Sequence, residues 1–85
     1  MKDLWNGPFR YRVSDTTGKL KQFRVWAEEG EVVIETGNVG GGLRISVKPV
    51  KRLHTKKTIE AEAIYRAKEI DRKKAQEGWK ERNDG

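Results

Sequence analysis

The chain has 85 residues, of which 34% are hydrophobic and 38% charged, and its formal net charge at pH 7 is +6. This length supports a single small domain over residues 1–85, with a core of roughly one helix on one sheet. The absence of Cys excludes disulfides and thiolate chemistry, and no apolar run reaches the roughly 18 residues that a membrane-spanning helix needs.

A lead-in over residues 1–8 precedes four segments in which apolar and polar residues alternate, as they do in half-buried strands. These segments are residues 9–13, 20–27, 31–36 and 43–48. Turn residues separate them at intervals of about 8–12 residues, which indicates an antiparallel meander. In the fourth segment Ile45 and its apolar neighbours point to one side, and Arg44 and Lys48 point to the other.

A long helix is predicted after these strands. Thr58 is a suitable N-cap, and Gly78 ends the helix after about Glu77. Five acidic and five basic residues balance within residues 59–77, so we expect the charges of the helix to serve solvation alone. We expect residues 80–85 to form a frayed tail. The predicted fold class is α+β, an antiparallel sheet of about four strands followed by one long C-terminal helix packed on one face.

The order of these elements from Gly18 to Trp79 resembles the WGR domain, a sheet-plus-helix module of poly(ADP-ribose) polymerases and of bacterial and phage proteins. The shared features are a strand with a central aromatic residue (Phe23), a tight hairpin, a glycine-containing triplet, a glycine turn and a helix that closes at glycine plus an aromatic residue. The pattern is closer still to the WGR-like segment at the front of some phage ATP-dependent DNA ligases. The resemblance implies this fold and a DNA-related role, accessory to repair, ligation or replication.

The family's Trp-Gly-Arg triplet falls on Thr36, Gly37 and Asn38, so only the glycine is kept. In the family the Trp and the Arg lie against a DNA strand end, and Thr and Asn supply neither stacking nor charge. The resemblance therefore supports the fold and a DNA-related role more than it supports recognition of a strand end.

The basic residues gather in one stretch of the sequence. Residues 36–59 contain no Asp or Glu, and outside this window the 13 remaining Lys and Arg equal the 13 acids, so the window carries the whole net charge. Such clustering is typical of nucleic-acid binding, although a solvated loop would look similar. The candidate DNA contacts are Asn38, Arg44, Lys48, Lys51, Arg52, His54, Lys56 and Lys57. Arg10, Arg12 and Arg24 would extend this surface if they share its face.

Other kinds of site are not expected. Gly37 to Gly42 has the spacing of a phosphate-binding loop, but Leu43 stands where that loop requires Lys. His54 is the only histidine and has no nucleophile or carboxylate placed around it in the sequence. We predict no catalytic residues, no cofactor and no metal.

The sequence therefore predicts a non-catalytic module that binds duplex DNA mainly through its phosphates. The alternative is a small protein-interaction module, for example a viral factor, that docks its basic face on an acidic partner such as a replication or repair protein. Because the N-terminus lacks the apolar stretch of a secretory signal, we expect an intracellular location, in the cytoplasm or nucleoid or in a viral host cell.

Overall fold

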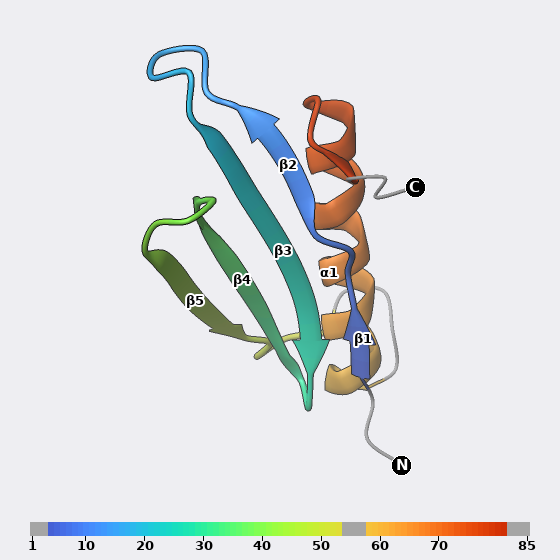
Figure 1. Ribbon diagram of the computed structural model, residues 1–85. Coiled ribbons are helices and arrows are strands. Elements are labelled where there is room, and N and C mark those ends of the chain that lie inside the picture. Colours follow the sequence, from blue (N-terminus) through green and yellow to red (C-terminus); the bar gives the residue numbers. More distant parts are fainter. Residues whose placement is uncertain (1–3, 54–57, 82–85) are drawn as a thin grey trace.

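The structure is a computed structural model that describes residues 4–53 and 58–81. These residues form six strands and one helix, elongated over 42 × 24 × 24 Å. The elements are β1 (Leu4–Asn6), β2 (Arg10–Val13), β3 (Leu20–Glu28), β4 (Glu31–Asn38), β5 (Leu43–Pro49), α1 (Ile59–Gln76) and β6 (Lys80–Glu81). In Figure 1, α1 lies along one face of the sheet, and β4 and β5 extend to one side of it.

The sheet is antiparallel, with the order β5-β4-β3-β2-β6. Strands β1 and β2 both pair with β3, one after the other along the same edge. Gly7 lies between them, and its N–H donates to the carbonyl of Val25 at 2.9 Å. The lead-in predicted over residues 1–8 was therefore wrong for residues 4–6, and Lys80 and Glu81 pair with β2 where a frayed tail was expected.

The core lies between β3 and α1. Along β3 alternate residues are buried, namely Phe23, Val25 and Ala27, and α1 supplies Ala63 and Ala67 opposite them. Alanines allow the helix to approach the sheet closely, while the strand supplies the larger side chains. This arrangement confirms the predicted fold class, an antiparallel sheet with one C-terminal helix on one face.

The ends of α1 follow from its sequence. The side chain of Thr58 accepts a hydrogen bond from the N–H of Ala61 at 3.1 Å, which confirms it as the N-cap. Gly78 follows the helix with φ +97°, a conformation that glycine adopts without strain. No helix within the described residues is both long and apolar enough to cross a membrane.

Two acidic residues of α1 are buried, contrary to the expectation that the charges of this helix serve solvation alone. Glu62 is 1% exposed and pairs with Arg66 across 3.3 Å. Asp71 is 9% exposed and pairs with Arg10 of β2. Buried carboxylates require a cation or hydrogen-bond donors. The pair of Asp71 with Arg10 joins the helix to the sheet, whereas the pair of Glu62 with Arg66 lies within the helix.

Candidate nucleic-acid interface

The register of the sheet places the basic residues of β5 on the same side as α1. Phe23 is buried beneath the helix, Thr36 lies opposite Phe23, and Arg44 lies opposite Thr36. Residues that face each other across antiparallel strands point to the same side of the sheet, so Arg44, and with it Lys48, points to the helix side.

The helix leaves β5 uncovered on that side. Strands are spaced about 4.8 Å apart and a helix is about 10 Å wide, so one helix covers roughly two strands. Here α1 packs mainly on β3 and β4, and all residues of β5 are exposed. The uncovered strip beside the helix is therefore open to a ligand.

A groove of about 380 Å³ occupies this strip near the C-terminal end of α1. Its lining residues come from β3, β4, β5, the β4–β5 turn, α1 and the segment that follows α1. They are Lys21, Gln22, Phe23, Thr36, Gly37, Asn38, Gly42, Arg44, Lys74 and Trp79. None of the described residues that line this groove is acidic, so we call it the basic groove.

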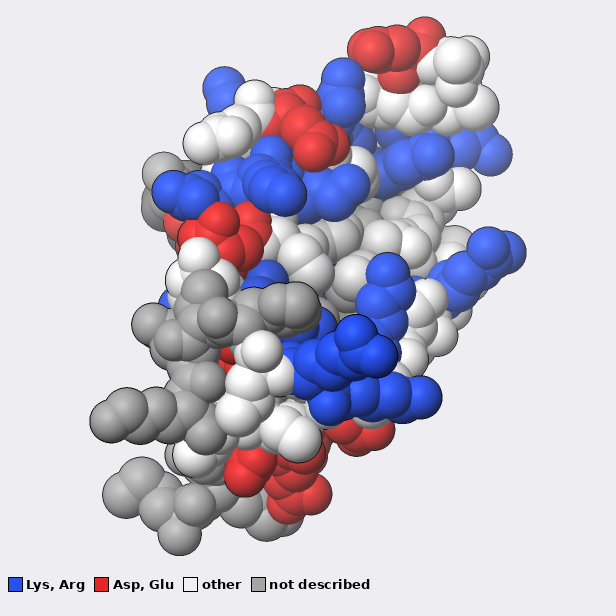
Figure 2. Space-filling view, turned by 180° about the vertical axis from the view of Figure 1, so that it is seen from behind, with Lys and Arg blue, Asp and Glu red and all other residues white. Residues whose placement is uncertain are grey.

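Three cations from three different elements surround the basic groove: Lys21 of β3, Arg44 of β5 and Lys74 of α1. Figure 2, which views the molecule from behind, shows Lys and Arg side chains on both sides of a pale hollow. Cations of like charge brought together without an acidic neighbour in the lining make a positive potential that attracts phosphate.

Aromatic rings support one of these cations. The Nζ atom of Lys74 lies 5.2 Å from the centre of the Phe23 ring and 5.7 Å from the centre of the Trp79 ring. The two rings are themselves 5.9 Å apart and tilted by 56°. Glu77 does not line the groove, but its Oε1 atom lies 3.6 Å from the same Nζ atom in a partly exposed ion pair and offsets part of the charge of Lys74. The rings therefore hold the Lys74 ammonium at the groove without neutralising it.

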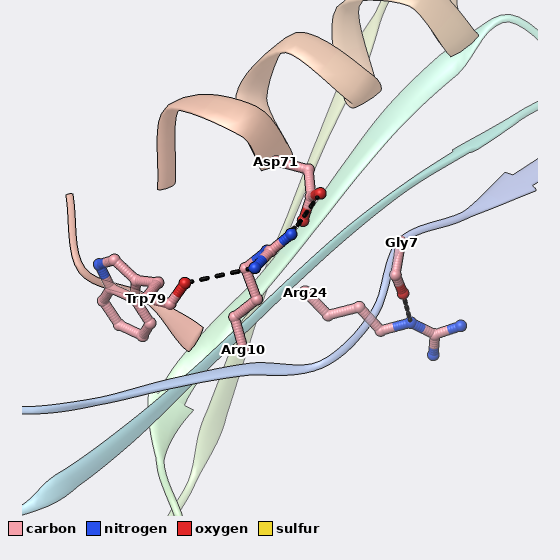
Figure 3. A network of polar contacts seen from close by, with 5 residues as sticks. All are labelled: Gly7, Arg10, Arg24, Asp71 and Trp79. Atoms are coloured by element: carbon pink, nitrogen blue, oxygen red, sulfur yellow. Dashed lines mark hydrogen bonds and ion pairs between the residues drawn. The ribbon is translucent and has the colours of Figure 1, made fainter. Parts of the chain in front are cut away.

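The backbone of Trp79 is fixed on both sides. Its N–H donates to the carbonyl of Lys74 at 3.0 Å, and its carbonyl accepts from Nη1 of Arg10 at 3.3 Å. Figure 3 shows Arg10 between Asp71 and this carbonyl. The buried ion pair of Arg10 and Asp71 thus positions the aromatic end of the groove as well as the helix.

The basic surface continues past Trp79. A second hollow, lined in part by Arg12, Lys21 and Trp79, adjoins the basic groove. Asp15 also lines it, and its Oδ2 lies 3.4 Å from Arg12. This exposed pair reduces the positive charge of the second hollow, so the basic groove is the stronger candidate site.

The structure brings some of the predicted contact residues together. Asn38 and Arg44 line the basic groove, and Lys48 lies further along the same side of β5. Lys51 and Arg52 are exposed just after Val50, which is buried. Within residues 4–53 and 58–81, no carboxylate forms an ion pair with these four cations. His54, Lys56 and Lys57 lie outside the described residues.

The three arginines that could have extended the surface, Arg10, Arg12 and Arg24, lie in different environments. Arg12 points to the helix side and lines the second hollow. Arg10 also points to the helix side but is engaged by Asp71. Arg24 points to the opposite face, where its guanidinium lies about 5 Å from the rings of Phe9 and Trp26. Only Arg12 therefore adds to the basic surface.

Sequence reasoning missed Lys21 and Lys74 as site residues, because the basic window contains neither of them. Two patterns could have found the lysines. Lys21 precedes Phe23 by two residues on a strand, so it shares the buried face. Lys74 follows Ala67 by seven residues, so it continues the buried stripe of α1. A cation at a position where the pattern requires an apolar residue is the signal of a site.

Within the described residues, no group of His, Cys, Asp and Glu is arranged to hold a metal ion. Comparisons with protein-family models, curated proteins and solved structures gave no match to this chain. The resemblance to the WGR domain therefore stays a prediction.

Proposed function

We propose that this chain is a non-catalytic module that binds duplex DNA through its phosphates, accessory to an enzyme of repair, ligation or replication. The observation that carries the proposal is the convergence of Lys21, Arg44 and Lys74 on one groove whose described lining residues include no acid. The resemblance of the sequence to the WGR domain supports the link to DNA.

The arrangement suits the backbone of DNA better than its bases. Lys and Arg on a sheet face contact phosphates, which carry no sequence information. Arg44 and Lys48 are four residues apart on one side of β5, a distance of about 13 Å along the strand, which is enough to reach two phosphates. We therefore expect affinity that depends strongly on salt and little on sequence.

The test is the affinity for a short labelled duplex, measured by fluorescence anisotropy as salt is raised. If three phosphates are neutralised in the groove, the slope of log K against log salt is about −2.7. A flat response would remove the proposal. An equal affinity for polyglutamate of the same charge would point instead to an acidic protein as the partner.

A pair of charge reversals locates the site. Arg44→Glu should weaken binding, because Arg44 lines the basic groove. Lys68→Glu changes the net charge by the same amount, but Lys68 lies on α1 beside Ala61, Ile64 and Tyr65, outside that groove. Equal losses from the two variants would show that only the overall charge matters.

A further inference from the structure

Among the described residues, strand β5 forms one edge of the sheet. It is the terminal strand in the order β5-β4-β3-β2-β6, and each of its seven residues is exposed. An edge strand presents unpaired backbone groups that can pair with another chain. This surface is distinct from the basic groove, although the two share Arg44.

The hydrogen-bond register shows which backbone groups of β5 are free to pair. The N–H of Val50 donates to the carbonyl of Gly30 at 3.0 Å, which extends the ladder between β4 and β5. In an antiparallel ladder alternate residues bond the neighbouring strand. Lys48, Ser46 and Arg44 therefore bond β4, and the backbone groups of the residues between them point away from the sheet.

The residues with outward backbone groups also carry exposed apolar side chains. Leu43 is 46% exposed, Ile45 57% and Val47 51%, and they point to the sheet face opposite α1. On the other face Arg44 and Lys48 form no ion pair with any described residue. The edge thus offers an apolar row on one face and a cationic row on the other.

We propose that β5 binds an extended segment of a partner protein in which acidic and apolar residues alternate. The segment adds a strand to the sheet through the outward backbone groups of β5. Its apolar side chains lie beside Ile45 and Val47, and its carboxylates lie beside Arg44 and Lys48, because cross-strand neighbours share a face. This inference does not depend on DNA binding.

A second copy of the chain is a poorer occupant. The antiparallel register that overlaps the whole of β5 is centred on Ser46, and it places Arg44 of one copy opposite Lys48 of the other. Like charges that face each other across strands are destabilising. The same cations that attract an acidic segment therefore discourage self-pairing of β5.

The probe is a capped peptide of about seven residues, the length of β5, in which Glu alternates with Val. We expect it to shift the backbone amide NMR signals of Leu43, Ile45 and Val47, which carry the outward N–H groups. A peptide with Lys in place of Glu should bind at least about tenfold more weakly, since it meets Arg44 and Lys48 with like charge. Equal binding of the two peptides would overturn the proposal.

Two changes test the backbone hydrogen bonds between β5 and the bound segment. Ile45→Pro removes an outward N–H, which an edge strand tolerates, and should weaken binding by about tenfold or more. Should this variant fail to fold, the unchanged protein is titrated with the Glu peptide N-methylated at every second amide, which cannot complete a ladder. Two such peptides are used, one for each alternate set of amides. Binding that survives in both of these peptides, or self-association of the chain through β5, would overturn the proposal.

Discussion

Arg10 of β2 and Asp71 of α1 form a bidentate ion pair across the interface between sheet and helix. Nε of Arg10 donates to Oδ1 at 2.7 Å, and Nη2 donates to Oδ2 at 2.9 Å. The hydrogen bond with Asp71 raises the pKa of Arg10, although burial acts in the opposite direction. Arg10 therefore stays charged at neutral pH. The pair joins residues that are 61 positions apart in the sequence.

Removal of one partner of this pair should lower the free energy of unfolding substantially. Arg10→Met leaves the carboxylate of Asp71 largely buried without its cation. Loss of one partner from a buried pair costs about 3–5 kcal/mol, and we expect the lower end here because the two side chains keep 14% and 13% exposure. The free energy of unfolding in urea measures the loss.

Two further variants serve as controls for that measurement. Asp71→Leu combined with Arg10→Met removes both charges, so the double variant should be more stable than Arg10→Met alone. Arg12→Met breaks the exposed pair with Asp15 and should cost at most about 1 kcal/mol. Equal losses for Arg10→Met and Arg12→Met would contradict a structural role for the buried pair.

Lys74→Met should remove one positive charge from the groove and keep the apolar contacts of this side chain. Methionine retains an unbranched apolar chain against the rings of Phe23 and Trp79 but cannot contact a phosphate. If Lys74 neutralises one phosphate, the slope of log K against log salt for duplex DNA should become shallower by about 0.9. An unchanged slope together with unchanged thermal stability would place Lys74 outside the interface.

Charge reversal at Lys51 and Arg52 should weaken binding to every duplex sequence about equally. Both residues are exposed after β5, and contacts with phosphates do not read bases. Titrations with several unrelated duplexes of one length measure the effect. A loss restricted to one sequence would argue for base recognition.

The large elements could be predicted because their signals are local. The alternation of β3 and the N-cap at Thr58 are each contained within a few residues of sequence, and both are confirmed. Strands β1 and β6 have three and two residues, too few to show alternation. They exist because β3 and β2 offer partners from distant parts of the chain, which no local pattern records.

The candidate site could be predicted only in part, for a similar reason. The acid-free window identified Asn38 and Arg44, which line the groove. Lys21 and Lys74 are 53 residues apart in the sequence, and both lie outside the acid-free window of residues 36–59. Their convergence depends on the packing of α1 over β3, so composition along the chain could not reveal it.

Gly37 lies where the groove has no room for a side chain. A Cβ atom at this position would lie 2.5 Å from the carbonyl oxygen of Gly42 and 2.8 Å from Cδ2 of Leu43. Because a backbone atom is the nearest neighbour, β4 and β5 must separate to admit it. Overpacking of this kind costs about 1–3 kcal/mol, so Gly37→Ala should lower the urea midpoint.

Gly42→Ala is the matched control for this substitution. Gly42 lines the same groove, but a Cβ atom there meets nothing within 4 Å and its φ is not in the left-handed region. Gly42→Ala should therefore leave stability unchanged or raise it by about 0.4–1 kcal/mol, since alanine restricts the unfolded chain. Separation of β4 from β5 would displace Arg44, which lies on β5 in the same groove, so Gly37→Ala should also reduce affinity for duplex DNA, and by more than Gly42→Ala does. If both variants unfold at the same urea concentration, the close approach of β4 and β5 at Gly37 does not constrain the groove.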